Sequence, residues 1–194
     1  MTSSCGYVKQ GELVAIIGPS GGGKTTLLNV LARRYNMLSH SEFAMNGNIL
    51  LNGKELTRQV FTKYGAFLEQ DDLLCDTNTP RELISESAKM RTNLPYDEIE
   101  RRTNKLIKLL NLEDAQNNIV GGLFSFTGIS AKERKRTALA VELITDPNLI
   151  FLDEPTSGLD SENAFTMIKM LKKETISRGA SVICTLHQPS SALF

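Results

Sequence analysis

The chain lacks tryptophan, has only three cysteines, and carries no surplus of either charge. Lys and Arg number 22, and Asp and Glu also number 22, so the sequence lacks the positive field that attracts nucleic acid or an anionic membrane surface. Cys5, Cys75 and Cys184 include no C-x-x-C pair, which argues against a zinc or redox motif and indicates the reduced thiols of a cytosolic protein. We therefore expect no nucleic-acid partner.

Long apolar runs are also missing. The two longest, Leu13 to Ile17 and Leu149 to Leu152, are far shorter than the ~20 residues that a membrane-spanning helix needs. Residues Met1 to Gly6 have neither the basic start nor the apolar stretch of a secretory signal. Because 194 residues, 41% of them hydrophobic, suffice for one buried core, we expect a single globular domain that stays in the cytosol.

Short apolar runs followed by turn residues are present, and they predict buried strands. The clearest runs are Leu13 to Ile17, Leu149 to Leu152 and Ser181 to Leu186, and weaker candidates are Asn48 to Leu51 and Tyr64 to Leu68. Short continuous apolar runs are typical of parallel strands that helices cover on both faces. The predicted fold class is therefore α/β with a parallel sheet.

The middle third of the chain has a different pattern. Between about residues 79 and 145, apolar side chains recur at helical spacing, with proline and glycine residues where helices begin or break. This pattern predicts a helical sub-lobe over about 79–145. The α/β core would then consist of about 1–78 and 146–194, within one domain that spans 1–194.

Residues Gly18 to Thr25 match the phosphate-loop pattern G-x-x-x-x-G-K-S/T, between an apolar strand and a helical segment. The glycines let backbone N–H groups point inward, and the following helix adds its positive N-terminal end. Lys24 is expected to reach the β- and γ-phosphates of ATP, and the Thr25 hydroxyl is expected to bind Mg²⁺. The residues predicted to contact the nucleotide are Gly18, Pro19, Ser20, Gly21, Gly22, Gly23, Lys24, Thr25 and Thr26.

Two carboxylates, Asp153 and Glu154, follow the predicted strand Leu149 to Leu152. Ligands of open α/β sheets lie at the C-terminal ends of the strands, so this acidic pair should face the phosphate loop. We assign Asp153 to Mg²⁺ and Glu154 to the base that polarises the attacking water. The two motifs together predict ATP hydrolysis with Mg²⁺ as the cofactor.

From about Val8 to the last residue, the order of motifs resembles the nucleotide-binding domains of ABC transporters, which have a P-loop NTPase core. Phe67 to Asp71 resembles the Q-loop, Thr156 to Ser161 resembles the D-loop, and His187 resembles the switch histidine. The resemblance implies that Gln70 senses Mg²⁺ and contacts the transmembrane part. The implied catalytic residues are Lys24, Gln70, Glu154 and His187, and the implied metal ligands are Thr25, Gln70 and Asp153.

Within that family, four stretches resemble subfamily G, which comprises half-transporters and pleiotropic drug transporters. The resemblance implies an ATPase that powers transmembrane export of lipophilic substrates such as sterols, lipids and hydrophobic compounds. It also implies two partners at the cytoplasmic face of a membrane: a second nucleotide-binding domain, identical or different, and a transmembrane domain. We expect a chain truncated at both ends, because membrane helices follow this domain in the subfamily. The four stretches are Gly11 to Ser20, Glu133 to Arg136, Ala140 to Ile144 and His187 to Ser191.

The family signature Leu-Ser-Gly-Gly-Gln corresponds here to Ile129 to Glu133, where Ala131 and Lys132 replace both glycines. In the family this segment closes over the γ-phosphate that the partner subunit holds, so the resemblance implies that Ser130 binds the partner's nucleotide. Ser130 and Glu133 also fit a capping box, which predicts a helix that begins there. The Lys132 side chain either blocks the approach of the backbone to phosphate or contacts the anion with its charge. The sequence leaves both effects open.

Tyr7 is the only aromatic residue close upstream of the phosphate loop. In the family an upstream aromatic ring stacks on adenine. Because Gly6 to Val8 resembles a strand, we expect Tyr7 in the core rather than as a platform for the base.

Two other functions compete with the transport ATPase. The first is a hydrolysis-poor ATP-binding half, which the altered signature favours. The second is an ABC-type ATPase of DNA repair or chromosome maintenance, which would need a basic surface or a long coiled-coil insertion. The sequence contains neither of these features.

Overall fold

The centre of the protein is a parallel sheet, seen in a computed structural model that describes residues 5–34, 47–71, 73–122 and 128–187. The fold confirms the predicted α/β class, and the three clearest strand predictions agree with the observed bounds. In spatial order, the strands of this sheet are β1 (Leu13–Ile17), β6 (Ser181–Leu186), β5 (Leu149–Leu152) and β4 (Gly65–Leu68).

Six helices are seen in the described residues, and several begin at caps that the sequence encodes. The Ser130 hydroxyl accepts the N–H of Glu133 in the predicted capping box, and Thr79 and Glu82 form another. No helix in the described ranges is both long and apolar enough to cross a bilayer. The helices are α1 (Lys24–Leu31), α2 (Arg58–Tyr64), α3 (Pro80–Arg91), α4 (Tyr96–Leu109), α5 (Ala131–Leu143) and α6 (Ser161–Arg178).

The two faces of the sheet belong to different hydrophobic clusters, because successive side chains of a strand point to opposite faces. In β5, Leu149 and Phe151 lie in a cluster with Leu28 of α1. Ile150 lies in a second, larger cluster with Leu139 of α5. All four residues of β5 are buried, which explains why its sequence is a continuous apolar run.

The candidate strand Asn48 to Leu51 differs from its prediction. Only β2 (Leu50–Leu51) is a strand, and it pairs antiparallel with β3 (Lys54–Glu55) outside the parallel sheet. The turn residues Asn52 and Gly53 have positive φ angles of 51° and 78°, as a tight hairpin turn requires.

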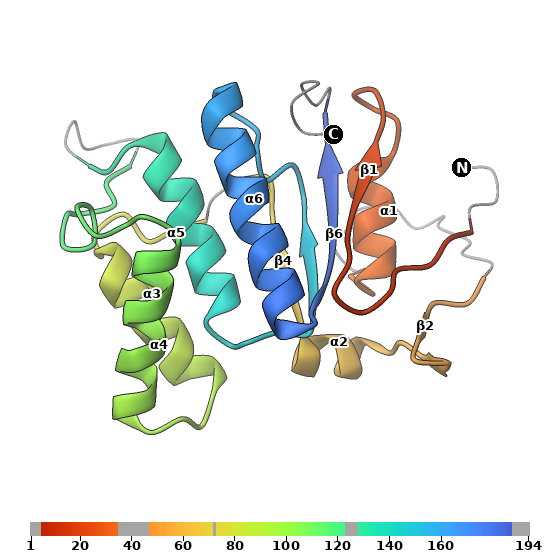
Figure 1. Ribbon diagram of the computed structural model, residues 1–194, viewed down its shortest axis with the longest axis horizontal. Helices are drawn as coiled ribbons and strands as arrows, with labels where there is room; N and C mark the ends of the chain where they lie inside the picture. Colours follow the sequence, from red (N-terminus) through yellow and green to blue (C-terminus); the bar gives the residue numbers. More distant parts are fainter. Residues whose placement is uncertain (1–4, 35–46, 72, 123–127, 188–194) are drawn as a thin grey trace.

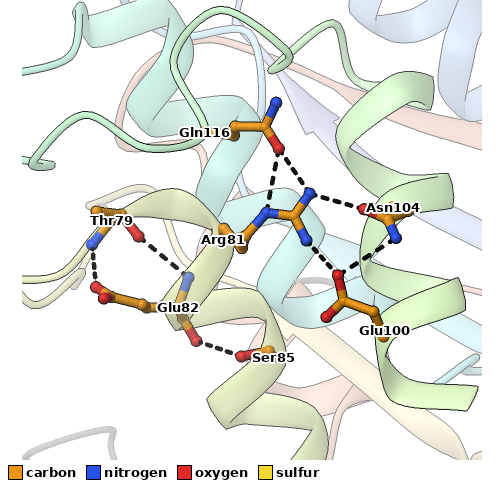
Figure 2. A network of polar contacts seen from close by, with 7 residues as sticks. All are labelled: Thr79, Arg81, Glu82, Ser85, Glu100, Asn104 and Gln116. Atoms are coloured by element: carbon orange, nitrogen blue, oxygen red, sulfur yellow. Dashed lines mark hydrogen bonds and ion pairs between the residues drawn. The ribbon is translucent and has the colours of Figure 1, made fainter. Parts of the chain in front are cut away.

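Helices α3 and α4 lie at the opposite end of the molecule from β1 and α1 (Figure 1). Figure 2 shows how Arg81 of α3 connects them to the following turn: its guanidinium lies 2.6 Å from Glu100 and donates to Asn104 and Gln116, both at 2.7 Å. Ile84 of α3 belongs to the same hydrophobic cluster as residues of the sheet. The bounds of the helical sub-lobe therefore stay a prediction.

Candidate nucleotide-binding site

The phosphate loop connects β1 to α1 and folds around a buried ammonium group. Gly21 and Gly23 have φ angles of 73° and 82°, a left-handed conformation that glycine adopts without steric cost. Lys24, only 8% exposed, donates from Nζ to the carbonyl oxygens of Gly18 and Pro19, both at 3.1 Å. The loop thus places a cation directly beside the N-terminus of α1, where the helix dipole favours an anion.

The acidic pair follows β5 and faces this loop. Asp153 is 3% exposed, and its Oδ1 accepts a hydrogen bond of 3.1 Å from the Thr25 hydroxyl. Glu154 Oε1 lies 3.6 Å from Lys24 Nζ. The structure therefore brings together four residues from the two predicted motifs, although their chemical roles stay predictions.

A threonine that the sequence analysis did not single out connects the two carboxylate residues. Thr185 in β6 is fully buried and donates to Asp153 Oδ1 at 2.6 Å. The same hydroxyl accepts the backbone N–H of Glu154 at 2.8 Å. Glu154 has a φ angle of 45°, unusual for a residue with a side chain, so this bond helps to hold a strained backbone. The sequence signal that could have identified Thr185 is a hydroxyl near the C-terminal end of a predicted buried strand.

Three other predicted site residues make their polar contacts elsewhere or lie outside this cluster in the part of the chain that the structure describes. Gln70 is exposed just after β4, and its backbone carbonyl accepts a hydrogen bond from Lys135. His187 is exposed immediately after β6. The Ser130 hydroxyl bonds to Glu133 at the start of α5. Among the described residues, no hydrogen bond or ion pair joins these three side chains to the phosphate loop or the acidic pair.

Within this chain, the Lys132 ammonium forms an ion pair, and its effect on a partner's phosphate stays a prediction. Its Nζ lies 2.8 Å from a carboxylate oxygen of Asp160, the N-cap residue of α6. The Lys132 ammonium, followed by the N–H groups of Asn163, holds the pKa of the Asp160 carboxyl well below its usual range. Both side chains are about half exposed, so this pair lies at the surface.

The site also suits a magnesium ion. Mg²⁺ prefers hard oxygen ligands, and the Thr25 hydroxyl and the Asp153 carboxylate are such ligands, already adjacent at 3.1 Å. Because Asp153 is buried among hydroxyl donors, a cation would add a charge partner to a carboxylate that water barely reaches. The residues present therefore fit the predicted metal.

The expectation that Tyr7 belongs to the core is wrong. Its side chain is 80% exposed, and residues 6–8 form no strand. The ammonium of Lys9 lies 5.9 Å from the centroid of the tyrosine ring. Backbone hydrogen bonds, such as the one that Gly11 donates to the Ala180 carbonyl, hold the segment before Leu13 in place. Tyr7 therefore does not have to pack into the core to fix this segment.

A glycine-rich loop between a parallel strand and a helix, opposite an acidic pair, defines a P-loop nucleotide-binding domain. A family model for "ABC transporter" matches residues 4–157. The chain belongs to the ABC transporter family, of which it is an ATP-binding domain.

Named relatives support the resemblance to subfamily G. ABC transporter G family member 2 of Dictyostelium discoideum is 46% identical over 97% of this chain and 14% of its own length. ABC multidrug transporter I of Aspergillus fumigatus is 43% identical, over all of this chain and 13% of its own length. Protein white of Drosophila melanogaster is 41% identical over 98% of this chain and 28% of its own length. The chain thus spans less than a third of each of these relatives, and its similarity to subfamily G covers nearly all of it.

Proposed function

We propose that this domain hydrolyses ATP and thereby powers transmembrane export of lipophilic substrates, such as sterols, lipids or hydrophobic compounds. The convergence of the phosphate loop with the acidic pair at one edge of the sheet carries this proposal. The substrate class is supported by the similarity to subfamily G and to a protein named as a multidrug transporter.

Phosphate binding would begin at Lys24. Its ammonium is now bound to two loop carbonyls and lies close to Glu154. A nucleotide phosphate offers a stronger, charge-assisted partner than a neutral carbonyl, so Lys24 would turn toward the β- and γ-phosphates. The backbone N–H groups of the loop and of the first turn of α1 would bind the same oxygens.

Magnesium would be held by Thr25 and Asp153, and Gln70 would approach from the segment after β4. When bound, Mg²⁺ neutralises charge that develops on the transferred phosphoryl group. Thr185 keeps Asp153 in place through its 2.6 Å hydrogen bond. The role of the protein here is to fix oxygen ligands in a buried, hydrogen-bonded arrangement.

Glu154 would accept the proton of the attacking water. Its left-handed backbone costs roughly 1 kcal/mol and directs the side chain toward Lys24, at the phosphate end of the site. His187 lies two residues beyond Thr185, so a small movement after β6 would bring its imidazole toward the same edge. We assign it to stabilising the γ-phosphate.

Transport driven by ATP would need two partners. A second nucleotide-binding domain, identical or different, would present its own Ser130 segment to the nucleotide bound here. A transmembrane domain would place this domain at the cytoplasmic face of a membrane. The exposed position of the Ser130 segment supports such an exchange.

The second candidate function is a hydrolysis-poor, ATP-binding regulatory half. The Lys132–Asp160 ion pair favours it, because a side chain now occupies the surface where the family has a glycine. An ATPase assay on the purified chain separates the two functions, with Lys24→Ala and Glu154→Gln as controls. We expect turnover that both substitutions abolish. ATP binding with turnover no higher than that of Glu154→Gln would instead support the regulatory half.

A further inference from the structure

Helix α5 carries a lysine that is buried rather than solvated. Lys135 is only 4% exposed, and its Nζ donates a hydrogen bond of 2.6 Å to the backbone carbonyl of Gln70. Burying an ammonium group costs free energy unless hydrogen bonds compensate for the lost water. A methionine would fill similar space without that cost, so the charge at this position calls for an explanation beyond packing.

The neighbours of Lys135 contact two other segments. Arg134 donates to the carbonyl of Gly121 and lies 3.4 Å from Asp76, and Arg136 donates to Asn163 in the first turn of α6 at 3.1 Å. Gln70 and Asp76 both lie in the connection between β4 and α3. Arg134 and Lys135 therefore contact the connection near its two ends, whereas Arg136 contacts α6.

Gln70 itself is anchored only through its backbone in the described structure. Its side chain is exposed, while its carbonyl is fixed by a short, charge-assisted bond to a rigid helix. The direction in which the Gln70 amide can reach therefore depends on where Lys135 holds the backbone. Ser130 is the N-cap residue of the same helix, so the bond also fixes the distance between the Gln70 segment and the Ser130 segment.

We propose that Lys135 is a positioning residue: through the Gln70 carbonyl it holds the segment after β4 against α5, and so presents the Gln70 amide to the Mg²⁺ of bound nucleotide. This inference rests on the proposed function, because it takes the metal site at Thr25 and Asp153 as given. It predicts that removing the ammonium will weaken metal-dependent binding without weakening the fold.

The test compares wild type with Lys135→Met, and with Lys172→Met as a matched change at an exposed lysine of α6. Calorimetry measures ATP affinity with and without Mg²⁺, and thermal unfolding measures stability. We expect the Mg²⁺-dependent gain in ATP affinity to be roughly tenfold smaller in Lys135→Met than in wild type, the lower end of the effect for residues that support metal ligands. Metal-free ATP affinity and the unfolding temperature should stay at or above the wild-type values.

Hydrogen exchange provides a readout that needs neither metal nor nucleotide. The amides of Glu69, Gln70 and Asp71 should exchange roughly tenfold faster in Lys135→Met, because the segment loses its hydrogen bond to α5 and keeps only the ion pair of Glu69 with Arg34. Lys135→Gln retains a donor and should recover part of both effects. If Lys135→Met does not fold, Lys135→Gln takes its place in the same measurements, with smaller expected effects.

A third variant, Gln70→Ala, separates this inference from the proposed function. If Gln70→Ala loses the Mg²⁺-dependent gain and Lys135→Met keeps it, the positioning role is overturned while the metal site stands. Unchanged exchange of the three amides in Lys135→Met overturns the positioning role as well. If wild type shows no Mg²⁺-dependent gain, or if Gln70→Ala keeps it, the assigned metal role fails and this inference fails with it.

Discussion

The edge of the sheet and the start of α5 differ in how completely the chain builds them. At the edge, Lys24 and Asp153 are 8% and 3% exposed, and hydrogen bonds connect the loop, the acidic pair and β6. At the start of α5, Lys132 and Asp160 are about half exposed and form one surface ion pair. The half predicted to bind phosphate is thus part of the protein core, whereas the half expected to meet a partner's nucleotide is an outward-facing surface.

Of the changes at the sheet edge and at the start of α5, removal of the Thr185 hydroxyl should have the largest effect on stability and on metal-dependent ATP binding. Thr185→Val keeps the shape of the side chain but removes one of the two hydroxyl donors to Asp153 and leaves the Glu154 N–H without its acceptor, which costs about 1–3 kcal/mol of unfolding free energy. We also expect the Mg²⁺-dependent gain in ATP affinity to fall. Chemical unfolding and calorimetry measure the two effects.

Thr175→Val is the matched control for this prediction. Thr175 is also a buried threonine, but its hydroxyl donates to a backbone carbonyl of its own helix, α6. It should lose stability and keep metal-dependent binding. Equal losses of metal-dependent binding in both variants would mean that the Thr185 hydroxyl matters to the fold alone. Thr185→Ser keeps the hydroxyl and should retain both the stability and the Mg²⁺-dependent gain in ATP affinity of wild type.

A smaller effect is expected at the start of α5. Restoring both glycines with Ala131→Gly and Lys132→Gly should raise turnover by about fivefold, equivalent to roughly 1 kcal/mol of barrier, because the backbone could approach the partner's phosphate more closely. Lys132→Gln separates the charge from the size of the side chain. Steady-state ATPase rates measure the effect, and unchanged turnover would mean that the replacements are neutral.

The smallest effect concerns the titration of Asp160. Its lowered pKa means that it stabilises the fold at pH values above the ordinary carboxyl pKa, and that this contribution is lost as the pH falls below that value. In Lys132→Gln the pKa should rise toward 3.8 yet stay below it, because the N–H groups of Asn163 remain. Carboxyl NMR titration measures the shift, and an unchanged pKa would show that the ion pair does not form in solution.

The strands and the phosphate loop could be predicted because their signals are local. A strand buried on both faces must be apolar along its length, as β5 is, and the loop needs glycine and lysine at fixed spacing. Helix α2 and the polar strand β3 carry no such signal. Tyr7 was misplaced because a strand-like stretch of three residues does not determine whether anything packs on it.

The contacts that complete the site could not be predicted, since they depend on tertiary register. Thr185 reaches Asp153 because β5 and β6 pair with Leu152 opposite Cys184, which places the next residues of the two strands side by side. Lys135 reaches Gln70 across 65 residues of sequence. In the sequence each is an ordinary threonine or lysine, and only the packing of α5 and the sheet gives it a partner.

If each chain contributes half of a catalytic site, two variants that are inactive for different reasons should regain activity when they are mixed. Lys24→Ala removes the phosphate-binding half, and Ser130→Asp keeps the helix cap while placing a negative charge against the partner's phosphate. We predict that neither variant hydrolyses ATP alone, and that an equimolar mixture recovers about a quarter of wild-type turnover, as random pairing of two chains requires. If the mixture is no more active than either variant alone, the catalytic site is not shared between two chains.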